Sequence, residues 1–150
     1  LYGNNHIEKS IATVDQINLS AIGENGSVLN LPVDKSAGIN LQGKKLFTIA
    51  VKTMALSMHK CCSNSGIQLT DMDVVVPHQA NQRITSAVEY RLKLAKDFIF
   101  SNIATYGNTS ACTIPIGMAE ALPNVKSGSK VGLCAFGGGF TAGAALLTIR

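Results

Sequence analysis

The chain has 150 residues, 46% of them apolar and 15% charged, so it is long enough to bury a core without disulfides or metals and too apolar to be disordered. Thirteen Lys and Arg against nine Asp and Glu give a net charge of +4; aromatic residues are few and cationic runs absent, which argues against nucleic-acid binding. No apolar run approaches the roughly 20 residues of a membrane-spanning helix. The start lacks an initiator Met and a signal-peptide pattern, so we expect a fragment or a processed chain.

Four cysteines show neither metal-binding nor redox spacing. Cys61 and Cys62 are adjacent, unlike a Cys-x-x-Cys pair, and no His follows at zinc-finger spacing. Cys112 and Cys134 lie in apolar surroundings, which predicts small buried side chains. We therefore expect four reduced thiols in a cytoplasmic protein with no metal site.

The first part of the chain predicts two strands and a long helix. Residues 17–22 alternate like a half-buried strand, and 23–26 form its turn. Residues 28–33 predict a return strand, and 34–43 a loop. A helix is expected over 44–61, because its apolar residues recur at steps of three and four. This apolar stripe consists of Phe47, Ala50, Val51, Met54, Ala55 and Met58.

A short apolar strand followed by a histidine stands at the centre of the chain. Val74 to Val76 are β-branched and uninterrupted by polar residues, which predicts a strand covered on both faces. His78 follows where open α/β sheets bind ligands, beyond the carboxyl ends of their strands. Taken alone, His78 fits either a catalytic group or a hydrogen-bonded structural residue.

The alternation of helices and strands continues to the end of the chain. A helix is expected over 81–94, a strand over 98–103, and a third helix with Ser110 as its cap. Residues 131–136 and 144–149 predict buried strands.

The order of these elements predicts the fold class. Strand and helix alternate, which is typical of an α/β fold with a mixed, mostly parallel sheet. The last two strands are expected to be antiparallel if Gly137 to Gly139 form a tight hairpin. The loops that carry His78, Asn108 and these glycines then gather at one end of the sheet.

These three loops predict carbonyl chemistry on a thioester. The imidazole of His78 and the carboxamide of Asn108 can each donate a hydrogen bond to one oxygen on which negative charge develops. The glycines let backbone N–H groups approach the same ligand. A nucleophile is missing, and a cysteine paired with His and Asn would complete an acyl-transfer site.

The three motifs carry a family resemblance. Residues 76–84 (Val-Pro-His-Gln-Ala-Asn-Gln-Arg-Ile), 106–111 (Tyr-Gly-Asn-Thr-Ser-Ala) and 135–141 (Ala-Phe-Gly-Gly-Gly-Phe-Thr) resemble the carboxyl-terminal half of β-ketoacyl-acyl carrier protein synthase III. They occur in the right order and at suitable spacing, and the resemblance extends from about residue 27 to the end. Residues 1–150 are therefore expected to form the C-terminal domain of such an enzyme.

The resemblance implies a thiolase fold of two similar α/β halves, usually in a homodimer. It implies an enzyme that takes an acyl group from coenzyme A onto a cysteine and condenses it with malonyl carried by acyl carrier protein, losing carbon dioxide. The expected partners are acyl carrier protein, a coenzyme A thioester and the N-terminal half of the same enzyme. No cofactor, nucleic acid or membrane is expected.

The same resemblance implies roles for individual residues. His78 and Asn108 would be the two members of the Cys-His-Asn triad found in this half, and Gly138 would offer its backbone N–H to an oxyanion. The cysteine belongs to the other half, so this part of the enzyme is expected to be inactive alone.

Binding residues also follow from the resemblance. Asn81, Leu41 and Gly43 would line the pantetheine tunnel, and Arg83 would meet the acidic carrier protein. Thr48 stands where the family can have a lysine for carrier docking, which makes that interaction less secure than the triad.

Two alternatives stay open at this point. The triad can serve another acceptor, as in relatives that make quinolones, polyketide starters or biotin precursors. The chain can also be a non-catalytic module that binds acyl carrier protein. An upstream reading frame with a cysteine in a small-residue context would favour the enzyme.

Overall fold

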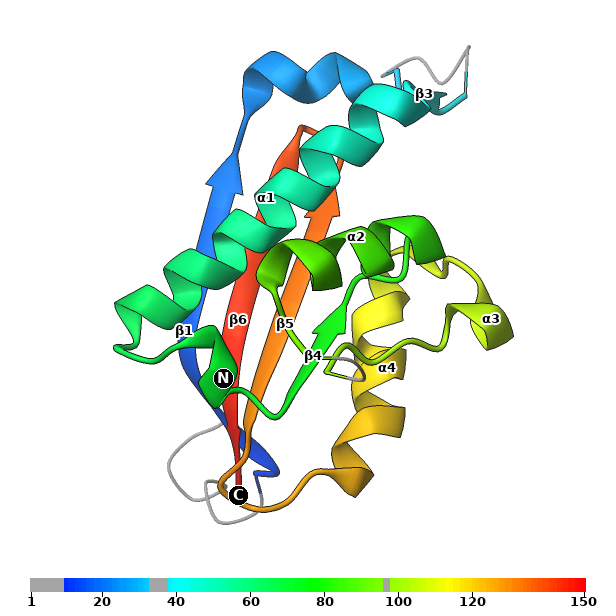
Figure 1. Ribbon diagram of the computed structural model, residues 1–150. Coiled ribbons are helices and arrows are strands. Elements are labelled where there is room, and N and C mark those ends of the chain that lie inside the picture. The colour runs from blue at the N-terminus through cyan, green and yellow to red at the C-terminus, as the bar shows by residue number, and fades with distance from the viewer. Residues whose placement is uncertain (1–9, 33–37, 96–97) are drawn as a thin grey trace.

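A four-stranded sheet in the order β1-β6-β5-β4 forms the middle layer of the computed structural model, which describes residues 10–32, 38–95 and 98–150 (Figure 1). The strands are β1 (Ala12–Ala21), β4 (Val74–Pro77), β5 (Lys130–Gly137) and β6 (Thr141–Ile149). β6 is antiparallel to both of its neighbours, whereas β4 and β5 are parallel. The predicted α/β class and mixed sheet are therefore confirmed.

The expectation of mostly parallel pairing is wrong, and the glycine turn explains why. Only residues 138–140 separate β5 from β6, with Gly137 paired to Thr141, and so short a turn allows only an antiparallel pair. β1 then pairs with the far side of β6 and is antiparallel to it as well. Three strands share one direction, but β6 lies between two of them.

Helices cover both faces of the sheet. α1 (Gly43–Asn64) and α2 (Gln82–Leu92) lie together on one face, and α4 (Thr113–Ala121) packs against β4 on the other (Figure 1). The short α3 (Ile103–Tyr106) precedes the loop with Asn108. All three predicted helices are present.

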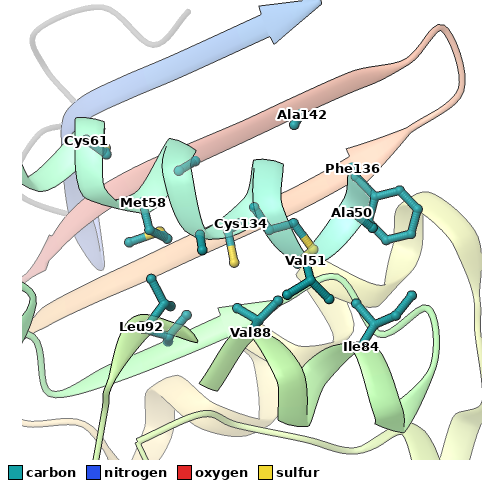
Figure 2. Close-up of a cluster of buried hydrophobic side chains, with 14 of the residues drawn as sticks. Ala50, Val51, Met58, Cys61, Ile84, Val88, Leu92, Cys134, Phe136 and Ala142 are labelled. Atoms are coloured by element: carbon teal, nitrogen blue, oxygen red, sulfur yellow. The ribbon is translucent and has the colours of Figure 1, made fainter. Parts of the chain in front are cut away.

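The main core lies between α1, α2 and the sheet. Figure 2 shows side chains of α1 and α2 directed toward one another and toward β5 and β6, with Cys134 and Phe136 contributed by β5. The predicted stripe of α1 is buried except for Phe47, which is partly exposed. A smaller cluster, built around Val76 and Ala121, fills the space between β4 and α4.

From Gln16 to Ser20 of β1 the apolar side chains are exposed and the polar ones half-buried, the reverse of an ordinary surface strand. Ile17 is 55% exposed and Leu19 79% exposed, whereas the polar residues that alternate with them, Gln16, Asn18 and Ser20, are half-buried. Gln16, Asn18 and Ser20 pair with Leu146, Ala144 and Ala142 of β6, which pack in the core with α1, so the polar face of β1 is on the α1 side of the sheet. The strand predicted at 17–22 is present but begins earlier, and its apolar side chains are exposed on the side of the sheet away from α1.

Two predicted strands are much shorter than expected. Of residues 28–33, only β2 (Leu29–Asn30) is a strand, and residue 33 lies outside the described residues. Its partner is β3 (Asn40–Leu41), within the segment predicted as a loop, of which residues 34–37 are also outside the described part.

The strand predicted at 98–103 is reduced to one bridge between Val75 and Ile99. Val75 N–H donates to the carbonyl of Phe98 at 2.8 Å, and Phe100 N–H donates to the carbonyl of Val75 at 2.9 Å. The next donor along β4 would be Pro77, which has no N–H, so the ladder stops there. The Gln79 side chain donates to the Phe100 carbonyl instead, at 3.2 Å.

The start of the third helix also differs from the prediction. Ser110 is not its cap: it begins a 3-10 turn, Ser110–Cys112, with a positive φ of 57°, and α4 starts at Thr113. Cys112 lies in this turn and is exposed, which corrects the expectation that it is buried. All four cysteines are free, as predicted.

Candidate active site

The carboxyl ends of β4 and β5 lie beside an open groove of about 1780 Å³. Parallel strands end at the same edge of a sheet, which brings the segments after Pro77 and Gly137 together. His78, Asn108 and Gly138 all line this groove; His78 and Gly138 follow the ends of β4 and β5, whereas Asn108 lies in the loop after α3. The groove extends over the face of the sheet that α4 leaves uncovered, so much of its wall is apolar.

His78 is held on three sides. Its backbone N–H donates to the carbonyl of Cys134 at 2.7 Å, which extends the β4–β5 ladder by one residue. Its Nδ1 lies 2.6 Å from Oγ1 of Thr113, and its ring meets that of Phe136 edge to face, with centroids 5.4 Å apart. Burial lowers the pKa of His78 because the charged imidazolium loses its hydration.

Asn108 is fixed through one half of its carboxamide. Its Oδ1 accepts a hydrogen bond from the backbone N–H of Ser110 at 2.8 Å. This local bond is the kind that Asn forms in turns, and it orients the side chain. The Nδ2 group has no partner within the described part of the chain, so both of its hydrogens are available to a ligand in the groove.

Glycine at position 138 is favoured by a close backbone approach. A Cβ there would lie 3.1 Å from the carbonyl oxygen of Leu29, which is tighter than ordinary contact. Thr141 Oγ1 donates to the Gly138 carbonyl at 3.2 Å and fixes the turn. The turn thus joins β5 to β6 as a hairpin and also forms a wall of the groove.

Gln79 braces the segment that carries His78. This side chain is 1% exposed, and its Nε2 donates to the carbonyls of Pro77 at 3.0 Å and Phe100 at 3.2 Å. Its Oε1 accepts from Ser101 Oγ at 3.1 Å. Through its bond to Phe100, Gln79 therefore replaces the one ladder hydrogen bond that Pro77 cannot donate.

The predicted binding residues line the same groove. Leu41 ends β3, Gly43 opens α1, and Asn81 and Arg83 lie at the start of α2. Asn81 has a structural role as well, since its Oδ1 caps α2 by accepting from Arg83 N–H at 2.8 Å. The Arg83 guanidinium lies 5.9 Å from the centre of the Phe47 ring, within range of a cation–π contact.

None of the four cysteines fits the missing nucleophile. Burial raises the pKa of Cys134 to about 12, which leaves an inert thiol. Cys112 is exposed but does not line the groove. Among the described residues no group of three or more His, Cys, Asp or Glu could hold a metal ion, and no helix is long and apolar enough to cross a membrane.

Sequence reasoning missed three residues that support the site: Thr113, Gln79 and Phe136. Thr113 is 35 positions from His78 and reaches it only because α4 packs against β4. Phe136 was assigned only to a buried strand, and its contact with His78 depends on the β4–β5 register. Gln79 lies in the 76–84 motif. Its role could have been predicted from Pro77, because a proline in a strand leaves a neighbouring carbonyl without its backbone N–H donor.

Comparison with known proteins defines the class. A crystal structure of 3-oxoacyl-[acyl-carrier-protein] synthase III from Aquifex aeolicus VF5 superimposes with a TM-score of 0.85 and 34% identity, over 93% of this chain and 46% of that one. The mixed sheet between helical layers, open on one side, is thus one half of a thiolase-like α/β fold.

The family follows from the sequence comparisons. A family model described as 3-Oxoacyl-[acyl-carrier-protein (ACP)] synthase III C terminal matches residues 62–149. Beta-ketoacyl-[acyl-carrier-protein] synthase III of Nitratidesulfovibrio vulgaris (strain DP4) is 42% identical over 111 residues, which are 73% of this chain and 34% of that protein. The chloroplastic synthase III B of Cuphea wrightii is 36% identical over 149 residues, covering 97% of this chain and 37% of that protein. The chain belongs to the synthase III family and spans less than half the length of these relatives.

Proposed function

We propose that the full-length protein is a 3-oxoacyl-[acyl-carrier-protein] synthase III that takes part in fatty acid biosynthesis. A cysteine outside this chain accepts the acyl group from a coenzyme A thioester. Malonyl on acyl carrier protein then loses carbon dioxide, and the resulting enolate attacks the acyl-cysteine. This chain supplies the groups that bind the malonyl thioester, and it is inactive without the other half.

One observation carries the proposal: His78 and Asn108, from segments 30 positions apart in sequence, line one groove, and each keeps an unpartnered nitrogen. Two hydrogen-bond donors that meet one carbonyl oxygen stabilise the enolate as carbon dioxide leaves, because negative charge builds on that oxygen. The decarboxylated carbon keeps the electron pair of the broken bond, and this pair forms the new carbon–carbon bond.

Two exposed cations of the groove support a phosphate-bearing thioester and an acidic partner. Lys44 and Arg83 line the groove, and the chain as a whole carries a net charge of +4. Exposed cations attract coenzyme A phosphates and the acidic surface of a carrier protein. Leu41, Gly43 and Asn81 then bind the pantetheine arm, and Gly138 N–H contacts the oxyanion of acyl transfer. We place this enzyme in the cytoplasm as a homodimer that needs no added cofactor.

The test uses His78→Ala and Asn108→Ala in the full-length protein. Each change should lower malonyl decarboxylation by about 10²–10³-fold, the usual effect of removing one such donor. Acylation of the cysteine, read by intact mass, should persist in part, because the lost donors serve the enolate.

Matched controls are His59→Ala and Asn30→Ala, two exposed residues of the same types outside the groove. Both should retain the activity of the unsubstituted protein. Normal condensation by the His78 and Asn108 variants would disprove the assignment.

A further inference from the structure

Thr113 makes a contact that the catalytic roles above do not use. It is the first residue of α4, it is 2% exposed, and its Oγ1 lies 2.6 Å from Nδ1 of His78. The same hydroxyl is 3.0 Å from the carbonyl oxygen of Ser110. A threonine hydroxyl has one hydrogen, so it donates to only one of these two groups at a time.

The distances favour donation to His78. The 2.6 Å contact between Thr113 Oγ1 and His78 Nδ1 is shorter than the about 2.7–3.2 Å that an N–H donor bonded to oxygen spans, which favours the hydroxyl as the donor. The Ser110 carbonyl already accepts the backbone N–H of Thr113, so it does not need the hydroxyl hydrogen. Nδ1 of His78, in contrast, has the Thr113 hydroxyl as its partner among the described residues.

The other ring nitrogen, Nε2, is free and accessible. Within the described part of the chain, the buried side-chain atoms without a partner are Oδ1 of Asn18 and Oγ1 of Thr85. Nε2 of His78 also lacks a partner among the described residues. It is absent from the buried atoms just named, so it is exposed to the groove that His78 lines. A neutral imidazole carries one N–H, and the position of that hydrogen decides whether Nε2 donates or accepts.

We propose that Thr113 is a positioning residue: its hydroxyl donates to Nδ1 of His78, which keeps the imidazole hydrogen on Nε2 and presents a donor to the groove. The catalytic consequence rests on the proposed function, since a donor at Nε2 is what the enolate oxygen requires. In the opposite tautomer, a lone pair on Nε2 would repel that oxygen. Burial, which lowers the pKa of His78, acts in the same direction because it keeps the imidazole neutral.

The tautomer can be measured without turnover. We suggest ¹⁵N NMR of the full-length protein labelled at histidine nitrogens, with His78→Gln to assign the signal. The expected result is a protonated Nε2 and a bare Nδ1 for His78. A protonated Nδ1 with a bare Nε2 would overturn the proposal, whatever the enzyme's activity proves to be.

Two substitutions separate the hydroxyl from the shape of the side chain. Thr113→Ser keeps the donor and should keep the tautomer. Thr113→Val keeps the volume, removes the donor, and should shift hydrogen from Nε2 to Nδ1 in part of the molecules. An unchanged His78 spectrum in a folded Thr113→Val protein would also overturn the proposal.

Kinetics give the second readout. Thr113→Val should slow malonyl decarboxylation by about tenfold or more, yet by less than His78→Ala, because a fraction of the imidazoles still donates. Thr113→Ser should restore most of the rate. A rate loss in Thr113→Ser equal to that in Thr113→Val would show that shape, and not the hydroxyl, is responsible. If His78→Ala leaves decarboxylation intact, the proposed function fails while the NMR result on Thr113 still stands.

Discussion

His78 and Asn108 each use one of two hydrogen-bonding atoms within the protein and leave the other for a ligand. His78 uses Nδ1 for Thr113, and Asn108 uses Oδ1 for Ser110 N–H. Each internal bond fixes the orientation of a planar group, so the remaining nitrogen is held in place before a ligand arrives. Preorganised donors stabilise developing charge better than mobile ones because no reorganisation is needed during the reaction.

Burial of His78 predicts a pH dependence of stability. The folded state lowers the pKa of this imidazole below its usual 6.5, so the unfolded chain binds a proton more strongly. The contribution of His78 to the free energy of unfolding is fully present above about pH 6.5, and it is lost as the pH falls through the folded pKa. Thermal denaturation of the full-length protein should therefore show a lower midpoint at about pH 5.5 than at about pH 7.5.

His78→Gln is the matched comparison for this effect. It removes the buried titrating group, so the midpoint should change less with pH than in the unsubstituted protein. Equal pH sensitivity of the two proteins would contradict the burial argument.

At the scale of elements, the packing of α4 on β4 determines where Thr113 lies. Gly117 allows this approach, because a Cβ at that position would be 2.8 Å from Cγ1 of Val76. Val76 is fully buried and β-branched, so it cannot turn aside easily. Gly117 is thus the point at which the helix that carries Thr113 contacts the strand that precedes His78.

Gly117→Ala should therefore destabilise the protein. We expect a loss of about 1–3 kcal/mol in the free energy of unfolding, the usual cost of overpacking a core, measured by urea denaturation. Gly23→Ala is the control, since a Cβ at Gly23 meets nothing within 4 Å, and it should change stability by less than about 0.5 kcal/mol. A Gly117→Ala protein as stable as the control would show that α4 can move away from β4.

At the scale of the whole molecule, the chain exposes an apolar face. Ile17 and Leu19 of β1 line the groove beside residues of β5 and β6, on the side of the sheet that α4 covers only in part. Exposed apolar surfaces of this kind mark contacts with another protein segment. The chain spans less than half the length of its relatives. Under the proposed function, the other half of the enzyme would cover this face.

The isolated chain should consequently self-associate. Light scattering is expected to show species larger than a monomer, and replacing both Ile17 and Leu19 with Lys should reduce them, because charged side chains oppose burial of the face. Leu56→Lys provides the control: Leu56 is 47% exposed on α1 and does not line the groove. If the unsubstituted chain is monomeric by light scattering, this face does not drive association and the prediction is wrong.

Much of the fold was predictable because it rests on local patterns. The three main helices and the strands at 74–77 and 130–149 follow from apolar periodicity and glycine punctuation. The segment at 98–103 was mispredicted because its pairing depends on Pro77, which lacks the N–H that a full parallel ladder requires. The exposure of Cys112 was missed because apolar neighbours in sequence did not reveal the tight turn that precedes α4.

The sequence by itself determined that His78 and the glycine turn meet at one edge of the sheet, because both follow predictable strands and parallel strands end together. Asn108 was expected there after a strand, but it reaches the groove from the loop that follows α3. Only the tertiary structure decided which nitrogen of His78 is free and that the apolar side of β1 faces away from α1. Both depend on contacts between residues far apart along the chain, Thr113 with His78 and β1 with β6, and no local pattern encodes such contacts.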